Sequence, residues 1–224
     1  MDAGRGTASD DDLDGSEVGS HVEGTYALDR LIFFADAVFA IAMTLLVLAI
    51  PRPENGTTVV SFLEHQDSGK FIAYIISFWV IALFWLAHHR LFRIVRRYDY
   101  GVLLLNLLVL FCIAFLPYPS AILGDHGTDV AATVFYALCV AATGAAFTLL
   151  SWYVVMLRDF TVPLPRSIAR LYVLRVVIVP AVFLASIPVA LAHYPSLAQK
   201  LWLLSFIVPA LGSLWMRRQA AQGS

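Results

Sequence analysis

Residues 30–48 read RLIFFADAVFAIAMTLLVL, an apolar run long enough to cross a membrane. A helix rises about 1.5 Å per residue, so roughly 20 such residues cross a hydrocarbon core about 30 Å thick. One carboxyl group, that of Asp36, lies inside this run. A charge at that depth costs roughly 2.5–3.5 kcal/mol on insertion scales, and it usually marks a pathway, a relay or a paired structural network.

The rest of the chain has the composition of an integral membrane protein. Of its 224 residues, 60% are hydrophobic and only 14% are charged. Its long runs are apolar on every face rather than at every second residue, which favours helices over the strands of a membrane barrel. The sequence therefore predicts an all-α polytopic membrane protein with six transmembrane helices, at approximately residues 31–50, 71–88, 101–123, 130–156, 170–191 and 197–215.

The chain divides into one membrane domain and two polar ends. Residues 1–24 are rich in Gly, Ser and Asp and have almost no large apolar side chains, which predicts a disordered acidic N-terminal tail. Residues 25–218 form the predicted six-helix transmembrane domain, and residues 219–224 form a short C-terminal tail.

Basic residues gather in alternate connections between the predicted spans. The connections after the second, fourth and sixth spans hold Arg90, Arg93, Arg96, Arg97, Arg158, Arg166, Arg170, Arg217 and Arg218. The opposite connections hold only Arg52, Lys70 and Lys200. Cytoplasmic loops of membrane proteins are enriched in Lys and Arg, so both termini are expected in the cytoplasm.

A stripe of side chains on the first span lies away from the carboxyl group. At about 100° per residue, with Asp36 at 0°, Thr44 falls near 80°, Leu48 near 120° and Ile41 near 140°, with Leu45 on the flank. Asp36 and the stripe are therefore expected to face different neighbours. Periodicity alone favours ordinary helix packing as the explanation of this stripe, because apolar stripes of this kind are common.

The second span ends in FWLAHHRLF, residues 84–92, which places Trp85, His88 and His89 at spacings of three and four. Their depth in the membrane is comparable to that of Asp36, which lies about 9 Å of helix rise from the start of the first span. The sequence predicts a hydrogen-bonded cluster that ties the first two spans together, because an unpaired buried charge is costly. A sharper alternative makes Asp36 with His88 or His89 a proton relay or a metal site.

Motifs of conventional enzymes are absent from the sequence. It has no H-E-x-x-H metal spacing, no G-x-S-x-G elbow and no phosphate-binding glycine loop. We therefore expect no enzymatic activity, no cofactor, no bound metal and no nucleic-acid partner.

Three motifs in the first three predicted spans suggest a family. They read R-x-x-x-F-A-D-A-V-F-A-I-A-M-T-L from Arg30, F-W-x-x-H-H-R-L-F from Phe84 and N-L-L-V-L-F-x-I-A-F-L-P-Y-P-S from Asn106. Together they resemble the prokaryotic members of the transmembrane protein 175 family of potassium channels. The resemblance implies a homotetramer in a bacterial plasma membrane, in which the first helix of each chain lines a central pore for potassium ions.

The resemblance also assigns roles to particular residues. Arg30, Phe34 and Asp36 match the family signature R-x-x-x-F-S-D, with Ala35 in place of its serine. The pore-constricting and selectivity residues of the family fall at Ile41, Thr44 and Leu48, with Leu45 beside them. Trp85, His88 and His89 complete the expected structural network. The resemblance therefore implies passive, potassium-preferring conduction of monovalent cations.

Two matters stay open from the sequence. Arg30 falls near 120° on the helical wheel, at the cytoplasmic mouth, where four arginines would repel cations unless helix tilt or an acid such as Asp29 offsets them. The alternative function is a proton-coupled secondary transporter that uses Asp36 and His88 as a relay, with the first span buried rather than lining a pore.

Overall fold

The computed structural model describes residues 11–50, 68–127, 129–157, 160–161 and 166–203. Within these ranges the fold is helical, apart from one isolated antiparallel bridge between Val95 and Thr161. The elements in chain order are α1 (Asp11–Leu45), the 3₁₀ turn η1 (Leu46–Ala49), α3 (Ser68–Phe92), α4 (Tyr100–Phe115), α5 (Pro117–Asp125), α6 (Val130–Trp152), the π-helical turn η2 (Tyr153–Leu157), α7 (Arg166–Leu191) and α8 (Pro195–Leu201).

Five stretches of the described residues are long and apolar enough to cross a membrane. They are Leu28–Ala49, Gly69–Phe92, Tyr100–Asp125, Val130–Leu157 and Ile168–Leu191. Each overlaps one of the first five predicted spans, so the all-helical, multi-pass architecture is confirmed. The predicted sixth span begins within α8, and its residues 204–215 lie outside the described residues.

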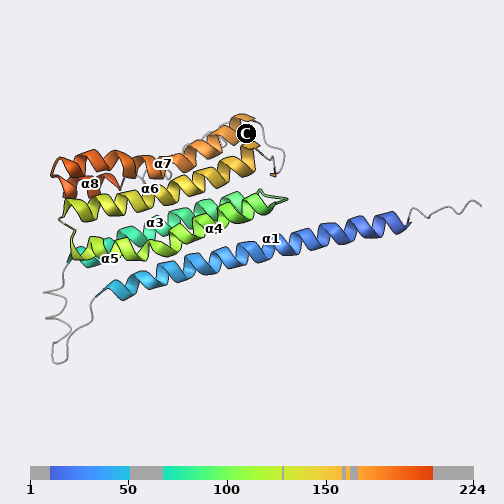
Figure 1. The fold of residues 1–224 in the computed structure, drawn as a ribbon, viewed down its shortest axis with the longest axis horizontal. Coiled ribbons are helices and arrows are strands. Elements are labelled where there is room, and N and C mark those ends of the chain that lie inside the picture. Colours follow the sequence, from blue (N-terminus) through green and yellow to red (C-terminus); the bar gives the residue numbers. More distant parts are fainter. Residues whose placement is uncertain (1–10, 51–67, 128, 158–159, 162–165, 204–224) are drawn as a thin grey trace, which may run out of the picture.

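The start of α1 differs from the expected disordered tail. The composition predicts disorder up to residue 24, whereas α1 begins at Asp11 and extends beyond the end of the bundle (Figure 1). Extending a formed helix by one residue gains a hydrogen bond for each residue fixed, and the costly step is the first turn. The apolar span supplies that nucleus, so the helix can continue into polar sequence. Residues 1–10 lie outside the described residues.

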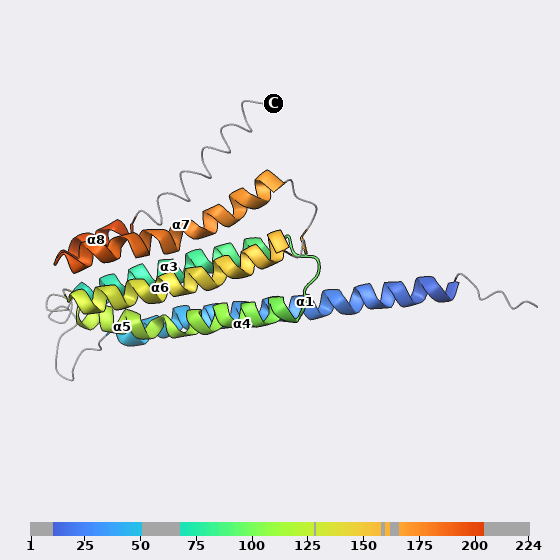
Figure 2. The same ribbon diagram turned by 45° about the horizontal axis from the view of Figure 1, so that its top comes forward.

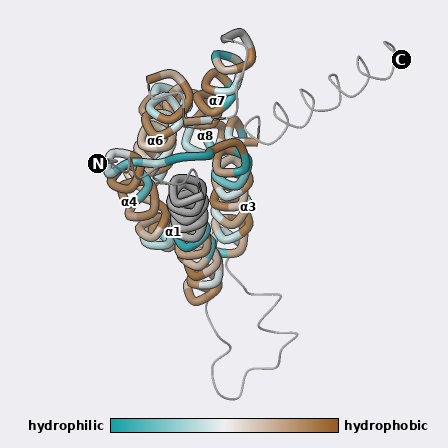
Figure 3. Tube along the Cα trace, turned by 90° about the vertical axis from the view of Figure 1, so that its right-hand side faces the viewer, coloured by the Kyte–Doolittle hydropathy of each residue, from teal (hydrophilic) through white to brown (hydrophobic). Residues whose placement is uncertain are grey.

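The helices run side by side, with α1 at one side of the bundle. Seen along the bundle, α1 lies beside α3 and α4, on the side away from α7 (Figure 3). In a second view α5 continues the line of α4 (Figure 2). The two are separate helices because Pro117 has no amide hydrogen to donate into the helix before it.

The closest helix packing in the described residues joins α6 to α7. A Cβ atom built on Gly144 of α6 would lie 2.6 Å from the Cβ of Pro180 on α7. Small residues allow helix backbones to approach closely in membranes, where no hydrophobic force between helices replaces lost contacts. Gly144 is therefore required for this contact.

We expect Gly144→Ala to lower the unfolding free energy in detergent by about 1–3 kcal/mol, because the added methyl group forces α6 and α7 apart. Unfolding in sodium dodecyl sulfate, followed by circular dichroism, measures this loss. Ala145→Leu, on the exposed side of the same helix, is the control and should change the transition little. Equal stability of Gly144→Ala and the parent protein would contradict the packing argument.

Candidate pore face and the network behind it

One side of α1 packs on the bundle. Leu31, Ala35, Phe39, Ala42 and Leu46 are all buried, and their spacings of three and four place them on a single face of the helix. This face contacts α3 and α4. It lies roughly 220–300° from Asp36 on the helical wheel.

The predicted stripe lies on the opposite side of α1. Ile41 is 58% exposed and Leu48 is 65% exposed, and Thr44 is exposed between them. Leu45 on the flank is 43% exposed. Packing among the described helices therefore leaves this apolar face of α1 uncovered, so contact with those helices does not explain the stripe.

Thr44 bonds to its own helix. Its hydroxyl donates to the carbonyl oxygen of Ile41 at 2.8 Å. This back-bond satisfies the hydroxyl hydrogen, which leaves the lone pairs of the oxygen as acceptors on the exposed face. A cation can therefore contact the lone pairs of this hydroxyl oxygen.

Asp36 lies half-buried on the flank of α1, between the packed face and the exposed stripe. The indole Nε1 of Trp85 on α3 donates a hydrogen bond to its Oδ1 at 2.8 Å. The Trp85 ring in turn stacks on the ring of His89, with centroids 5.7 Å apart. This contact joins the first two spans and fixes the rotation of α1 about its axis.

His88 forms its hydrogen bond with α4 rather than with Asp36. Its Nε2 and the Oδ1 of Asn106 on α4 are 2.9 Å apart, and both side chains are buried. Its ring packs against those of Phe92, at a centroid distance of 4.4 Å, and Phe39, at 5.4 Å. The residues of the predicted cluster thus form two separate hydrogen bonds, Asp36 with Trp85 and His88 with Asn106.

Asn106 is the one partner in this region that sequence reasoning did not single out. A buried amide in an apolar span carries the same signal as Asp36, since an unsatisfied polar group in hydrocarbon costs several kcal/mol. Two atoms still have no partner among the described residues, the Nδ1 of His88 and the Nδ2 of Asn106. The buried Ala35, where the family signature has serine, offers neither of them a hydroxyl group.

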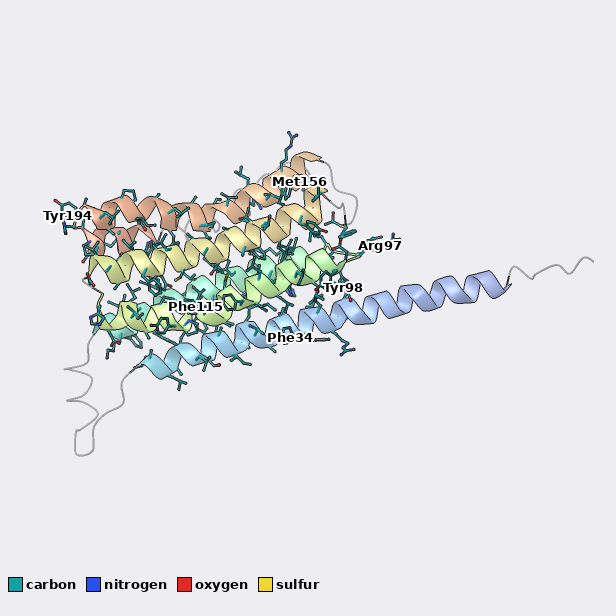
Figure 4. All side chains as sticks on the ribbon, viewed as in Figure 1. Phe34, Arg97, Tyr98, Phe115, Met156 and Tyr194 are labelled. Carbon is teal, nitrogen blue, oxygen red and sulfur yellow. The ribbon has the colours of Figure 1, made fainter. Side chains whose placement is uncertain are left out.

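Arg30 and Phe34 lie outside this network. Both are exposed, Phe34 to 53%, and both fall on the same side of α1 as the stripe. Figure 4 shows Phe34 pointing away from the other helices. Among the described residues, no group of three His, Cys, Asp or Glu side chains could hold a metal ion.

The comparisons with known proteins cover the same part of the chain. Residues 30–117 match the model of the family described as the endosomal/lysosomal potassium channel TMEM175. A protein of Streptomyces collinus named as a potassium channel is 39% identical over 130 residues, covering 55% of this chain and 63% of that protein. The chain also superposes on the crystal structure of a lysosomal potassium-selective channel TMEM175 homolog from Chamaesiphon minutus, with a TM-score of 0.59 and 28% identity, covering 80% of this chain and 98% of that one. The first half of the chain is thus similar to TMEM175 channels in sequence, and its fold is similar to theirs.

Two further relatives show how much of each protein the similarity covers. A potassium channel of Chamaesiphon minutus is 36% identical over 121 residues, covering 50% of this chain and 59% of that protein. The human relative, named as an endosomal/lysosomal proton channel, is 28% identical over 134 residues, which is 26% of its length. The chain thus spans about three fifths of the length of the two bacterial relatives. All of these relatives are named as channels, which are not enzymes.

We expect Trp85→Phe to destabilise the protein by about 1.5–3 kcal/mol, because it removes the indole donor from a carboxyl group that has no other described partner. The decrease in the unfolding midpoint in detergent measures this loss. Trp79→Phe is the matched control, since Trp79 lies on the same helix and is 54% exposed. Asp36→Leu in the Trp85→Phe background should recover part of the loss. Equal effects at Trp79 and Trp85 would contradict a specific role for the contact.

Proposed function

We propose that four copies of this chain form a potassium-preferring cation channel, with α1 of each copy lining a central pore. The observation that carries this proposal is the uncovered stripe of α1, opposite the face that packs on α3 and α4. One such helix cannot enclose a pathway, whereas a ring of symmetry-related copies can. The names of the bacterial relatives support potassium as the permeant ion.

The pore is a hydrophobic constriction in this proposal. Rings of four Ile41 and four Leu48 side chains surround the axis and offer no oxygen ligands. Such a constriction gates by dewetting, and conduction requires a hydrated ion to deform or lose part of its shell. The constriction therefore discriminates among cations through the cost of dehydration.

Thr44 supplies the polar element between these two rings. Its hydroxyl hydrogen is already donated to Ile41, so its oxygen is oriented to accept from water or to contact a partly dehydrated cation. Four such oxygens are fewer than the carbonyl rings of a rigid filter. We therefore expect modest preference for potassium over sodium.

The buried contacts hold α1 in this orientation. Asp36 with Trp85 fixes the flank of α1 against α3, and Phe39 packs on His88. In the assembled channel, Leu45 contacts a neighbouring copy and Arg30 lies at the cytoplasmic mouth. The proposed setting is the bacterial plasma membrane with both termini in the cytoplasm, as the distribution of Arg and Lys favours.

The transporter alternative has less support. It needs a proton path between Asp36 and His88, yet the described partner of Asp36 is an indole and that of His88 is an amide. Neither the indole of Trp85 nor the amide of Asn106 gains or loses a proton in the physiological pH range. Saturable, proton-coupled uptake without unitary currents would favour the transporter.

Recordings from the purified protein in planar bilayers test the channel directly. Under opposed potassium and sodium gradients we expect unitary cation currents whose reversal potential lies on the potassium side. Anion-selective current, or no current at all from a correctly folded protein, would contradict the proposal.

A further inference from the structure

Four arginines occur within eight residues, at the end of α3 and in the connection that follows it. All four are exposed: Arg90, Arg93, Arg96 and Arg97. Figure 4 shows Arg97 at the same end of the bundle as Met156, with Tyr194 at the opposite end. In the part of the chain that the structure describes, none of their guanidinium groups bonds to another residue. We call these four residues the arginine cluster.

The segment that carries the cluster is held in place. The amide of Arg96 donates to the carbonyl oxygen of Phe160 at 2.8 Å, and the buried Val95 forms a bridge with Thr161. These contacts fix the backbone of the connection between α3 and α4 against the segment that follows α6. Burial of Val95 directs its arginine neighbour outward, so the guanidinium groups are held at the surface rather than in the core.

Two carboxyl groups at this end of the bundle accept hydrogen bonds from groups other than the arginines. Asp99 accepts from the amide of Val102 at 2.9 Å and from the hydroxyl of Tyr153 at 2.8 Å, and Asp36 accepts from Trp85. By contrast, the lysine at the other end of the bundle, Lys70, forms an ion pair with Asp125 at 2.8 Å. The arginine cluster therefore presents positive charge that these acids do not neutralise.

Exposed aromatic residues place the cluster at the level of the lipid headgroups. Tyr100 begins α4 and is 72% exposed, and Trp152 ends α6 and is 45% exposed. The bond between Asp99 and Tyr153 shows that these two helix ends lie at the same level. Exposed Tyr and Trp mark the boundary between hydrocarbon and water, where lipid phosphates lie.

We propose that the arginine cluster binds the headgroups of anionic phospholipids. Guanidinium groups are planar, always charged, and suited to bidentate contacts with phosphate oxygens. Because the cluster carries four positive charges within eight residues, it favours a lipid with net negative charge over a zwitterionic one, whose own cation it repels. Lipid retention is measured on the purified protein, whether or not that protein conducts ions.

Native mass spectrometry in a neutral detergent tests the proposal, with phosphatidylglycerol and phosphatidylcholine of identical acyl chains as probes. We expect the protein to retain phosphatidylglycerol about tenfold better than phosphatidylcholine. The variant Arg93→Gln/Arg96→Gln/Arg97→Gln should bring this ratio close to one, whereas the corresponding triple lysine variant should keep most of the preference. Lys200→Gln, which removes an exposed charge near the other end, should keep all of it.

Three results would overturn the proposal. The first is equal retention of the two lipids by the parent protein. The second is a preference unchanged in the triple glutamine variant when its elution volume and melting temperature match those of the parent. The third is complete displacement of phosphatidylglycerol by millimolar inorganic phosphate, which would identify an ion site rather than a lipid site.

Discussion

Replacing Ile41 with asparagine is expected to raise the potassium conductance of the reconstituted protein about tenfold. Four amides in place of four sec-butyl groups let water fill the constriction, and lowering the barrier by about 1.4 kcal/mol gives a tenfold change in rate. The substitution should not unfold the chain, because Ile41 is exposed and contributes little to packing within it. Single-channel recordings and the leak of potassium-loaded vesicles both measure the effect.

Leu138→Asn is the matched control for this prediction. Leu138 lies on α6 and is 49% exposed, so the same polar group is introduced at a comparably exposed apolar position. It lies on α6 and not on the helix that lines the proposed pore, so we expect the conductance of this variant to equal that of the parent protein. An equal rise in both variants would mean that the leak arises from general disruption of the membrane domain.

Replacing Thr44 with valine is expected to lower the potassium-to-sodium permeability ratio about two- to fivefold, because the change removes a polar contact worth about 0.5–1 kcal/mol at a nearly constant side-chain shape. The reversal potential under opposed gradients of the two ions should move toward zero. The conductance itself should fall or stay constant, since the ring becomes fully apolar.

Thr148→Val provides the comparison for the valine substitution at position 44. The hydroxyl of Thr148 bonds back to the carbonyl oxygen of Gly144 at 2.7 Å, as that of Thr44 does to Ile41, but Thr148 lies on α6. A change in selectivity at Thr44 alone assigns the effect to the ion path. An unchanged permeability ratio in Thr44→Val would remove Thr44 from the selectivity mechanism.

Much of the fold could be predicted from hydropathy and periodicity. The bilayer requires long apolar helices, so the first five spans are visible as apolar runs, with boundaries close to those of the five stretches that are long and apolar enough to cross a membrane. The angle between Asp36 and the stripe on α1 was also predictable, because the helical repeat fixes it before any tertiary contact forms. In the structure the residues at 80–140° from Asp36 are exposed, and the opposite side of the helix is packed.

Partners within the buried network were harder to predict. Spacing and depth brought Asp36 close to Trp85, His88 and His89, but could not decide which side chain Asp36 would contact. That choice depends on the position of α4, which carries Asn106 and draws His88 to itself. A contact between three helices needs their relative rotation, and a single sequence does not contain it.

Packing within one chain does not explain the side chains of Arg30 and Phe34. Both match the family signature, yet both are exposed in the single chain. Contacts between copies, rather than packing within one copy, would account for their presence in the signature. The proposed tetramer therefore predicts that Phe34 becomes buried on assembly, whereas Arg30 lies at the cytoplasmic mouth.

The mass of the purified protein in mild detergent tests the central claim most directly. Light scattering corrected for bound detergent should give four copies of the 24.7-kDa chain. Cysteine introduced at Ile41, in a background without Cys112 and Cys139, should then cross-link neighbouring copies through α1. A protein that is monomeric across detergents and concentrations, and that forms no cross-link at position 41, would contradict a pore lined by α1.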